Sequence, residues 1–147
     1  MKLAWLAVSG PEEMKREALA RLEMIADTYL SLNAPIQMAA PLLLQQRAAF
    51  QQQVAARVRR NLSELDSQLA GKKQFGRLEI EAGWYAVLRI PATRPDEELA
   101  IDLLEQHDVY VHPGHFYDFP AEGYLVVSLI TPEQEFVEGV RRVLSAM

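Results

Sequence analysis

A long apolar stripe in the middle of the chain restricts the architectures that this sequence can adopt. The stripe is made of Val54, Val58, Leu62, Leu65 and Leu69. Steps of three and four residues are typical of one face of an α-helix. A helix from Met38 to Ala70 would be roughly 50 Å long, which exceeds the width of a compact domain of this size. We therefore predict a long helix that joins two bodies, kinked or restarted at Pro41 and capped at its end by Gly71.

The segment before this helix is predicted to contain one strand and one helix. Residues 3–8 form a short apolar run that ends at a Ser-Gly-Pro sequence, a pattern that favours a strand buried on both faces. The other strand candidates lie far along the chain, so we interpret this run as a strand separated from its own sheet. Ser9 and Glu12 have the spacing of a capping box. The apolar residues that follow extend the predicted helix to about Leu30.

The C-terminal half changes to alternating apolar and polar residues interrupted by short helical patterns. Strands are expected at residues 83–91, 109–112 and 124–130. Helices are expected to start at two capping boxes, Thr93 with Asp96 and Thr131 with Gln134. The predicted fold class is therefore α+β: a long helical segment joined to a small α/β sandwich, with an antiparallel or mixed sheet and helices on one face.

Charge and composition exclude several classes of partner. The formal net charge of the 147-residue chain is −5, whereas nucleic-acid binding needs a basic face, so we expect no nucleic-acid partner. Cysteine is absent, which excludes disulfides and thiolate sites and is compatible with a reducing compartment; we expect the protein in the cytoplasm. The apolar run at residues 3–8 is too short for a signal-peptide core or a membrane span, so no membrane partner is expected.

Motif spacing alone predicts a scaffold without a catalytic group. His112 and His115 have an H-x-x-H spacing, but they flank a Pro-Gly turn and no carboxylate-rich motif accompanies them. We therefore interpret them as turn histidines and expect no metal site. The sequence contains no G-x-S-x-G, Walker or G-x-G-x-x-G motif, so the usual hydrolase, P-loop and dinucleotide-binding parts are missing.

Four segments carry a resemblance to a known family. They are, in chain order, KLAWLAVSGP, IADTYLSLNAPIQ, VYVHPGHFYDF and GYLVVSLITPEQEFVEGVRRVL. Together they resemble the C-terminal part of a fold type I pyridoxal-phosphate-dependent aminotransferase of the class I/II group, which includes aspartate aminotransferase. The resemblance covers essentially the whole chain. It implies that residues 1–34 are the tail of the large cofactor-binding domain, residues 35–71 the interdomain helix, and residues 72–147 the small C-terminal domain.

The resemblance assigns one cofactor contact to the chain. Lys2 stands where the family usually has an arginine that grips the cofactor phosphate, and a lysine can supply the same charge. The family's Schiff-base lysine would fall ahead of Met1, so we expect no catalytic residue in this chain. The complete enzyme would use pyridoxal phosphate, and we expect none to be bound by this chain alone.

The resemblance also names substrate-pocket candidates. The Pro-Gly turn and the strand after it line the substrate side in the family, so the candidates are His115, Tyr117 and Val126. The family's carboxylate-binding arginine would fall at Val126, and a valine cannot pair with a carboxylate. Arg89, or a residue outside this chain, would then have to compensate.

The sequence SLNAPIQ, at the end of the second of these segments, resembles the family segment that reaches the active site of the second subunit. It makes Asn33 and Gln37 candidate contacts across a homodimer. The alternative interpretation is that their polarity serves a helix-breaking loop.

Three functions remain open from the sequence. The resemblance implies the C-terminal domain of an aminotransferase, which transfers an amino group between an amino acid and a 2-oxo acid and is inert as the isolated chain. An alternative is a stand-alone dimeric interaction or ligand-binding module without catalysis, in which the long helix pairs with a copy of itself. A third is a pyridoxal-phosphate enzyme of the same fold with a different reaction. Uncovered apolar faces on residues 3–8 and on the following helix would favour a fragment over a module.

Overall fold

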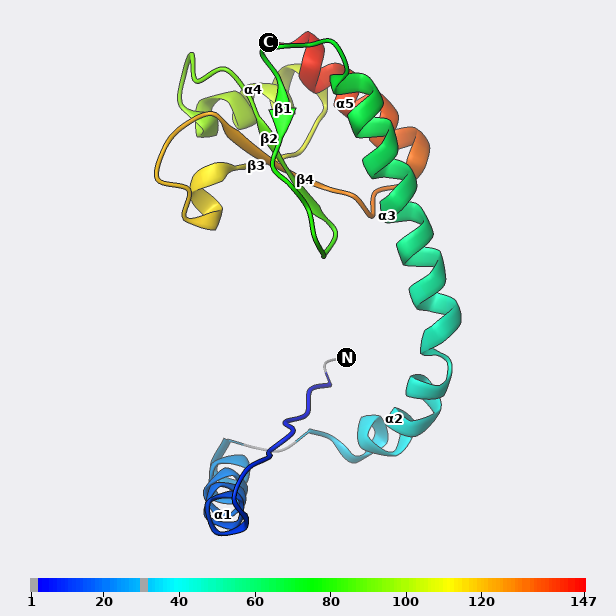
Figure 1. Ribbon diagram of the computed structural model, residues 1–147, viewed down its shortest axis with the longest axis vertical. Helices are drawn as coiled ribbons and strands as arrows, with labels where there is room; N and C mark the ends of the chain where they lie inside the picture. The colour runs from blue at the N-terminus through cyan, green and yellow to red at the C-terminus, as the bar shows by residue number, and fades with distance from the viewer. Residues whose placement is uncertain (1–2, 30–31) are drawn as a thin grey trace. The chain divides into compact units, whose positions relative to one another are not determined.

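The computed structural model describes residues 3–29 and 32–147. Contacts divide the chain into two compact units, Met1–Ala49 and Phe50–Met147 (Figure 1). This boundary falls inside the segment that the resemblance assigns to the interdomain helix, and the assignment of the units to parts of a larger enzyme stays a prediction. Lys2 and the predicted helix end at Leu30 lie outside the described residues.

The first unit contains helices α1 (Glu12–Tyr29) and α2 (Ala34–Gln45). The predicted strand at residues 3–8 is wrong, because these residues have no strand assignment. A strand needs a hydrogen-bonded neighbour, and no described residue of this unit forms one. The run remains exposed, with Trp5 at 66% and Leu6 at 75% exposure. Helix α1 contains no buried residue.

Asn33 and Pro35 mark the start of helix α2. Asn33 is the N-cap, with its side-chain oxygen 3.1 Å from the amide nitrogen of Ile36, and Pro35 occupies the first turn. A restart at Pro41 is wrong, because Pro41 lies inside α2 and the interruption falls at Gln46; a kink at Pro41 stays a prediction. The long helical segment therefore consists of α2 and α3 (Arg47–Leu69). Gly71 follows α3 with a φ of +78°, as expected for a glycine beyond a helix end.

The second unit is built on a four-stranded sheet. Its strands are β1 (Gly76–Arg77), β2 (Tyr85–Arg89), β3 (His112–Pro113) and β4 (Tyr124–Ser128), in the order β1-β2-β4-β3. Every neighbouring pair is antiparallel. The strands are shorter than predicted, above all at residues 109–111, which are not paired in the sheet.

Helices cover one face of this sheet, as predicted. Helices α4 (Asp96–His107) and α5 (Glu133–Ser145) and the C-terminal part of α3 contribute to one core with the sheet. The fully buried members include Leu65, Leu103, Leu125 and Leu129. Helix α5 shows the expected stripe, with Phe136, Val140, Val143 and Leu144 buried. The sequence therefore predicted the α+β class and the covered face correctly.

The two predicted capping boxes do not form. Prolines, Pro95 and Pro132, occupy the N-cap positions of α4 and α5, and neither helix has a side-chain cap hydrogen bond. Thr131 instead donates its hydroxyl to the carbonyl of Ser128 at 3.1 Å. The carboxylate of Asp96 bonds to the loop before β4 and to the first residue of β4 instead of capping α4. Asp96 is 2% exposed. Its carboxylate accepts hydrogen bonds from the amides of Gly123 and Tyr124 at 2.7 and 3.0 Å.

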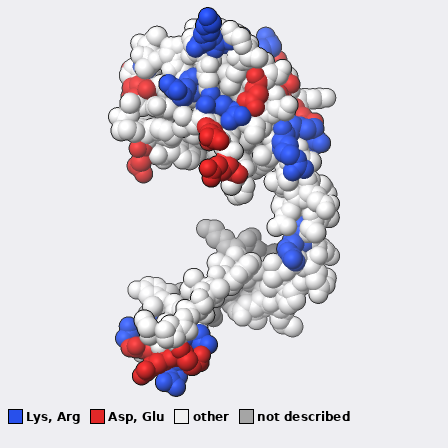
Figure 2. Space-filling model, viewed as in Figure 1, with Lys and Arg blue, Asp and Glu red and all other residues white. Residues whose placement is uncertain are grey.

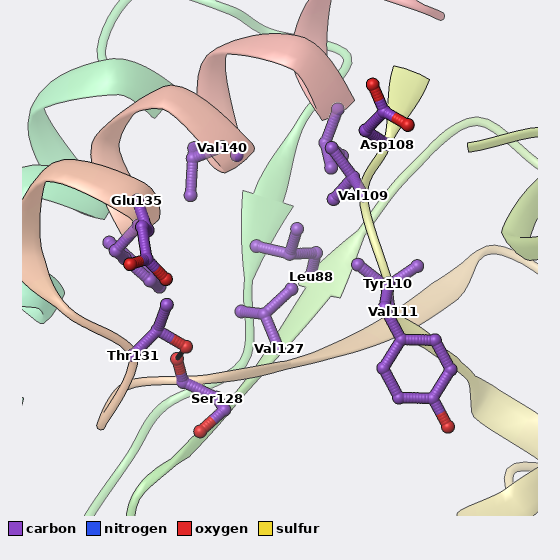
Figure 3. Close-up of a pocket in the computed structure, with 13 residues that line it drawn as sticks. Leu88, Asp108, Val109, Tyr110, Val111, Val127, Ser128, Thr131, Glu135 and Val140 are labelled. Carbon is purple, nitrogen blue, oxygen red and sulfur yellow. Dashed lines mark hydrogen bonds between the residues drawn. The ribbon is translucent and has the colours of Figure 1, made fainter. Parts of the chain in front are cut away.

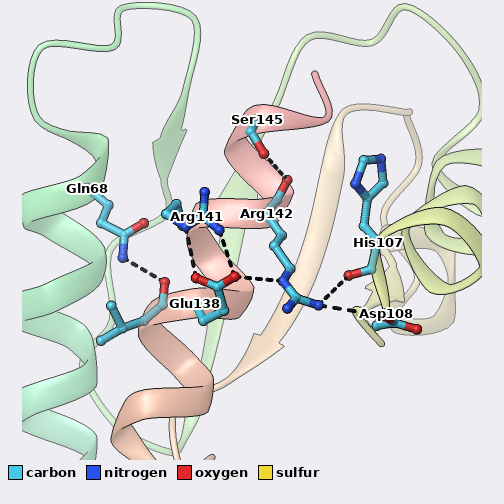
Figure 4. Close-up of polar contacts among 8 residues, drawn as sticks. Gln68, His107, Asp108, Glu138, Arg141, Arg142 and Ser145 are labelled. Atoms are coloured by element: carbon cyan, nitrogen blue, oxygen red, sulfur yellow. Dashed lines mark hydrogen bonds and ion pairs between the residues drawn. The ribbon is translucent and has the colours of Figure 1, made fainter.

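Polar contacts join α5 to the neighbouring helices (Figure 4). Arg142 donates to the carbonyl oxygen of His107 at the end of α4, at 2.9 Å, and Gln68 of α3 donates to the carbonyl oxygen of Val137 at 3.0 Å. Glu138 accepts hydrogen bonds from Arg141 and Arg142, which lower its pKa to about 2. The bonds of Arg142 and Gln68 thus link α5 to α4 and α3.

The surface of the second unit shows mixed charge. Acidic and basic side chains are interspersed over its visible face in Figure 2. Among the described residues, no helix is both long enough and apolar enough to cross a membrane.

Candidate functional site

The face of the sheet opposite the helices brings together residues from three strands. The register pairs Val87 with Val126, and Arg89 with Tyr124; His112 also pairs with Val126. Because side chains alternate along a strand, these residues lie on the face opposite the core residues Leu88, Leu125 and Val127. Tyr85, the first residue of β2, lies on the same face as Val87 and Arg89. We call this side of the sheet the open face.

A Pro-Gly turn folds the chain back after β3. Pro113 precedes the short 3₁₀ helix η1 (Gly114–Tyr117). A Cβ atom added to Gly114 would lie 2.8 Å from Cβ of Tyr124, closer than side chains normally approach. Glycine is therefore required at this position, because the turn packs directly on β4. This packing explains the turn residues and brings Tyr117 to the open face.

Aromatic rings from the turn and the strands form one cluster. We define the aromatic cluster as Trp84, Tyr85, Tyr110, His112, Phe116 and Tyr117. The centroid of the His112 ring lies 5.9 Å from that of Tyr117, in a stacked arrangement, and 5.1 Å from that of Tyr110. Tyr117 also meets Tyr85 edge to face at 5.9 Å. The cluster therefore links η1, β2 and the chain around β3.

His112 is the polar centre of this cluster. Its Nδ1 atom lies 2.8 Å from the hydroxyl of Tyr117, and its Nε2 atom lies 3.1 Å from the hydroxyl of Tyr110. Removal from water, together with the neighbouring hydroxyl of Tyr85, raises the pKa of Tyr117. Tyr117 is therefore neutral near pH 7 and keeps a hydroxyl proton to donate. Tyr110 and Tyr117 remain 71% and 39% exposed.

The predicted substrate-pocket residues of this unit occupy different positions. Val126 lies on the open face but is only 3% exposed, directly across from His112. Tyr117 belongs to the aromatic cluster. His115 is exposed, and the centroid of its ring lies 4.8 Å from that of Phe116. Arg89 is exposed on the open face, paired with Tyr124 rather than with Val126. The structure thus brings Tyr117 and Val126 together through His112.

The ring nitrogens of His112 face tyrosine hydroxyls, and the absence of a metal site at His112 and His115 stays a prediction. Both nitrogens of the His112 ring are bonded to tyrosine hydroxyls. Across residues 3–29 and 32–147, no three side chains of His, Cys, Asp or Glu gather in a way that could hold a metal ion.

The candidate second-subunit contacts have local roles in the first unit. Asn33 caps α2 with its side-chain oxygen. The side-chain amide of Gln37 donates to the carbonyl oxygen of Leu32 at 2.5 Å. These bonds account for polar residues at a helix start, and contacts with a second subunit stay a prediction.

Sequence reasoning missed Tyr85, Tyr110 and His112 as members of one site. The alternation at residues 109–112 could have placed Tyr110 and His112 on the same side of the chain. Their meeting with Tyr85 could not be read from spacing, because it depends on the register between β2, β4 and β3.

A separate cavity of about 400 Å³ lies on the helix-covered side of the sheet (Figure 3). Apolar side chains such as Leu88, Val127 and Val140 line it, together with the polar residues Thr131 and Glu135. Of the aromatic cluster, only Tyr110 borders this cavity, and none of the predicted site residues does.

Comparison with known proteins identifies the family. The family model for aminotransferase class I and II matches residues 2–143. The chain therefore belongs to the class I and II aminotransferase family. A search of curated proteins found no match.

Solved structures of aminotransferases share the fold. A probable N-succinyldiaminopimelate aminotransferase from Thermus thermophilus superposes with a TM-score of 0.74 at 25% identity, over 89% of this chain and 35% of that protein. An aspartate aminotransferase from Thermotoga maritima gives 0.72 at 20% identity, over 90% and 33% of the two chains. An α-aminoadipate aminotransferase, also from Thermus thermophilus, gives 0.69 at 22% identity, over 88% and 35%. The chain thus spans about a third of the length of these proteins.

Family membership implies pyridoxal phosphate in the complete enzyme, and amino and 2-oxo acids as the substrates of its members. The residues of the second unit offer no lysine beside the aromatic cluster for this cofactor. The unit that holds the aromatic cluster has two lysines, Lys72 and Lys73, and both are exposed directly after α3. The open face therefore offers aromatic, imidazole and apolar groups but no amine that could bind the cofactor aldehyde.

Proposed function

We propose that this chain is the C-terminal portion of a pyridoxal-phosphate-dependent aminotransferase and that its open face forms one wall of the substrate pocket. The complete enzyme would transfer an amino group between an amino acid and a 2-oxo acid. The observation that carries the proposal is that a chain matching the family over residues 2–143 spans only about a third of the solved relatives. The part of the enzyme that holds the cofactor then lies elsewhere in the complete polypeptide.

The exposed apolar residues of the first unit support this proposal over a stand-alone module. Met14 is 67% exposed and Tyr29 is 79% exposed on α1, and the run at residues 3–8 is similarly uncovered. A soluble monomer rarely leaves such surface open, whereas a part of a larger enzyme has it covered by the remaining chain. Light scattering of the purified chain tests this point: association supports a part of a larger enzyme, and a monodisperse species of fixed stoichiometry supports the module.

The activity test compares two polypeptides. The coding sequence upstream of Met1 is read for an in-frame segment with Ser-Lys shortly before KLAW, and the extended polypeptide and the 147-residue chain are assayed with pyridoxal phosphate and pairs of amino and 2-oxo acids. Transamination by the extended polypeptide alone is expected. Detectable transamination by the 147-residue chain would contradict its proposed inertness, and decarboxylation or elimination by the extended polypeptide would favour the alternative reaction on the same scaffold.

The remaining assignments belong to the same proposal. Lys2 would contribute charge to the cofactor phosphate. Asn33 and Gln37 would contact the second subunit of a homodimer. Sedimentation of the extended polypeptide tests the dimer, and a Lys2→Ala variant with an unchanged affinity for pyridoxal phosphate would exclude Lys2 from the phosphate site.

A further inference from the structure

We propose that Asp96 is a positioning residue for the wall of the substrate pocket. Its buried carboxylate holds the start of β4, and the Pro-Gly turn that brings Tyr117 to the open face rests on that start. This inference rests on the proposed function, because it takes the open face as one wall of the pocket. It assigns a role in substrate binding to a side chain that is itself closed to solvent.

Asp96 and residues 122–124 hold each other through three hydrogen bonds. The carboxylate of Asp96 accepts from the amides of Gly123 and Tyr124, one at each oxygen. The amide of Asp96 donates in return to the carboxylate of Glu122 at 2.6 Å. Among residues 3–29 and 32–147, no basic side chain forms an ion pair with Asp96. Because directed N–H donors compensate this buried carboxylate in place of a cation, its two oxygens fix the backbone at the start of β4.

The Pro-Gly turn packs directly on this bonded pair. The atoms nearest to a Cβ built on Gly114 are Cβ and the carbonyl oxygen of Tyr124, at 2.8 and 3.2 Å, and Oδ2 of Asp96, at 3.3 Å. The same Oδ2 atom accepts the hydrogen bond from the amide of Tyr124. A displacement of either partner would therefore move the surface on which Gly114 rests, because a close-packed interior transmits such shifts.

The segment that follows the turn is supported by Tyr124 as well. The ring of Phe119 stacks on the ring of Tyr124, with the two centroids 4.6 Å apart. The amide of Phe119 donates to the carbonyl oxygen of Gly114 at 3.4 Å, which closes the segment into a loop. Tyr117 lies between these two supports in the chain. Its position on the open face thus depends on Tyr124 and, through the amide of Tyr124, on Asp96.

Positioning and stability predict different kinetic results. A loss of folded enzyme lowers the apparent kcat and leaves KM unchanged, because the molecules that remain folded bind substrate normally. A displaced pocket wall raises KM in every molecule. Asp96→Asn is the suitable change, since it keeps the size of the side chain and one oxygen acceptor but places an N–H donor against a backbone amide.

The first experiment measures kcat and KM of the extended polypeptide for the amino acid that it turns over fastest. In Asp96→Asn, kcat/KM is expected to fall about tenfold to a hundredfold, mainly through KM, because small misplacements of binding groups are costly. Glu97→Gln is the matched control, in the same turn of α4 but exposed, and it should change neither constant. A fall in kcat at constant KM, equal effects of the two substitutions, or no effect of Asp96→Asn would each overturn the inference.

The second experiment does not depend on activity and separates this inference from the proposed function. Amide hydrogen exchange of the 147-residue chain is followed by mass spectrometry in peptides that cover residues 112–119 and α5. The amides of Asp118 and Phe119 are hydrogen-bonded to His115 and Gly114 in the first of these peptides. Asp96→Asn is expected to speed exchange there by at least about threefold and to leave α5 unchanged.

That result would support the control of the turn by Asp96 even if the extended polypeptide transaminates nothing, an outcome that contradicts the proposed function alone. Equal acceleration in both peptides would assign the effect to general destabilisation. Either that result or unchanged exchange in residues 112–119 overturns the inference, whatever the extended polypeptide does.

Discussion

Replacing Asp96 should destabilise the second unit more than any other change of a charged residue in α4. Its carboxylate accepts hydrogen bonds from the amides of Gly123 and Tyr124, and the residue is 2% exposed. In Asp96→Ala both amides lose their acceptor, and each unpaired buried donor costs about 1–3 kcal/mol. The expected loss is therefore about 2–6 kcal/mol of unfolding free energy, a large part of the stability of an ordinary domain.

The magnitude can be checked against a neighbour with the same charge. Glu97 lies in the same first turn of α4 and is exposed, so Glu97→Ala removes a similar charge near the helix start without uncovering a buried amide. That variant should cost less than about 1 kcal/mol. Asp96→Asn should fall between the two, because its amide keeps one oxygen acceptor.

The assay is urea unfolding of the 147-residue chain followed by tryptophan fluorescence. The chain has two tryptophans, and a Trp5→Phe background leaves Trp84 as a reporter in the second unit. An unchanged midpoint and slope in Asp96→Ala would refute the reasoning. A loss in Glu97→Ala as large as that in Asp96→Ala would also refute it, since it would assign the effect to charge at the helix start.

The remaining predictions concern packing, pH and activity. Gly114→Ala should lose about 1–3 kcal/mol of unfolding free energy in the same assay, because its Cβ would lie 2.8 Å from that of Tyr124. Gly139→Ala should gain about 0.5–1 kcal/mol, because Gly139 lies inside α5 and its added Cβ would meet nothing within 4 Å. Similar values for both variants would contradict the packing argument. The Glu138 carboxyl should titrate near pH 2 by NMR. Because its folded pKa lies below the ordinary value of 4.5, its contribution to stability should be present above that value and lost as the pH falls toward 2. Glu138→Gln should therefore flatten the dependence of stability on pH in this window. An unchanged pH dependence would exclude the contribution. The 147-residue chain should show no transamination, as the assay above measures.

Several predictions from the sequence succeeded because they depend on neighbours along the chain. The apolar periodicity of α1 and α5 predicted both helices, and Pro35 and Gly71 marked a helix start and a helix end. Such signals act through the backbone of the same few residues, so that distant contacts change them little.

The sequence predictions that failed share one physical cause, which is that the structure depends on contacts with residues distant in the chain. Residues 3–8 have the composition of a strand, but a strand forms only where another strand supplies hydrogen bonds. Thr93 and Asp96 have the spacing of a cap, yet the Asp96 carboxylate binds amides of residues 123 and 124 instead. In both cases the structure depended on residues far away in the sequence, which the local pattern does not include.

The sequence by itself determined the family, the helix pattern and the α+β class, because collinear motifs and periodicity are properties of the chain order. Only the tertiary structure decided the candidate site. Tyr85, His112 and Val126 meet because antiparallel pairing aligns β2, β4 and β3, and a shift of one residue in either register would turn the affected side chains to the opposite face. The close packing of Gly114 on Tyr124 then brings Tyr117 to His112, which no spacing in the sequence reveals.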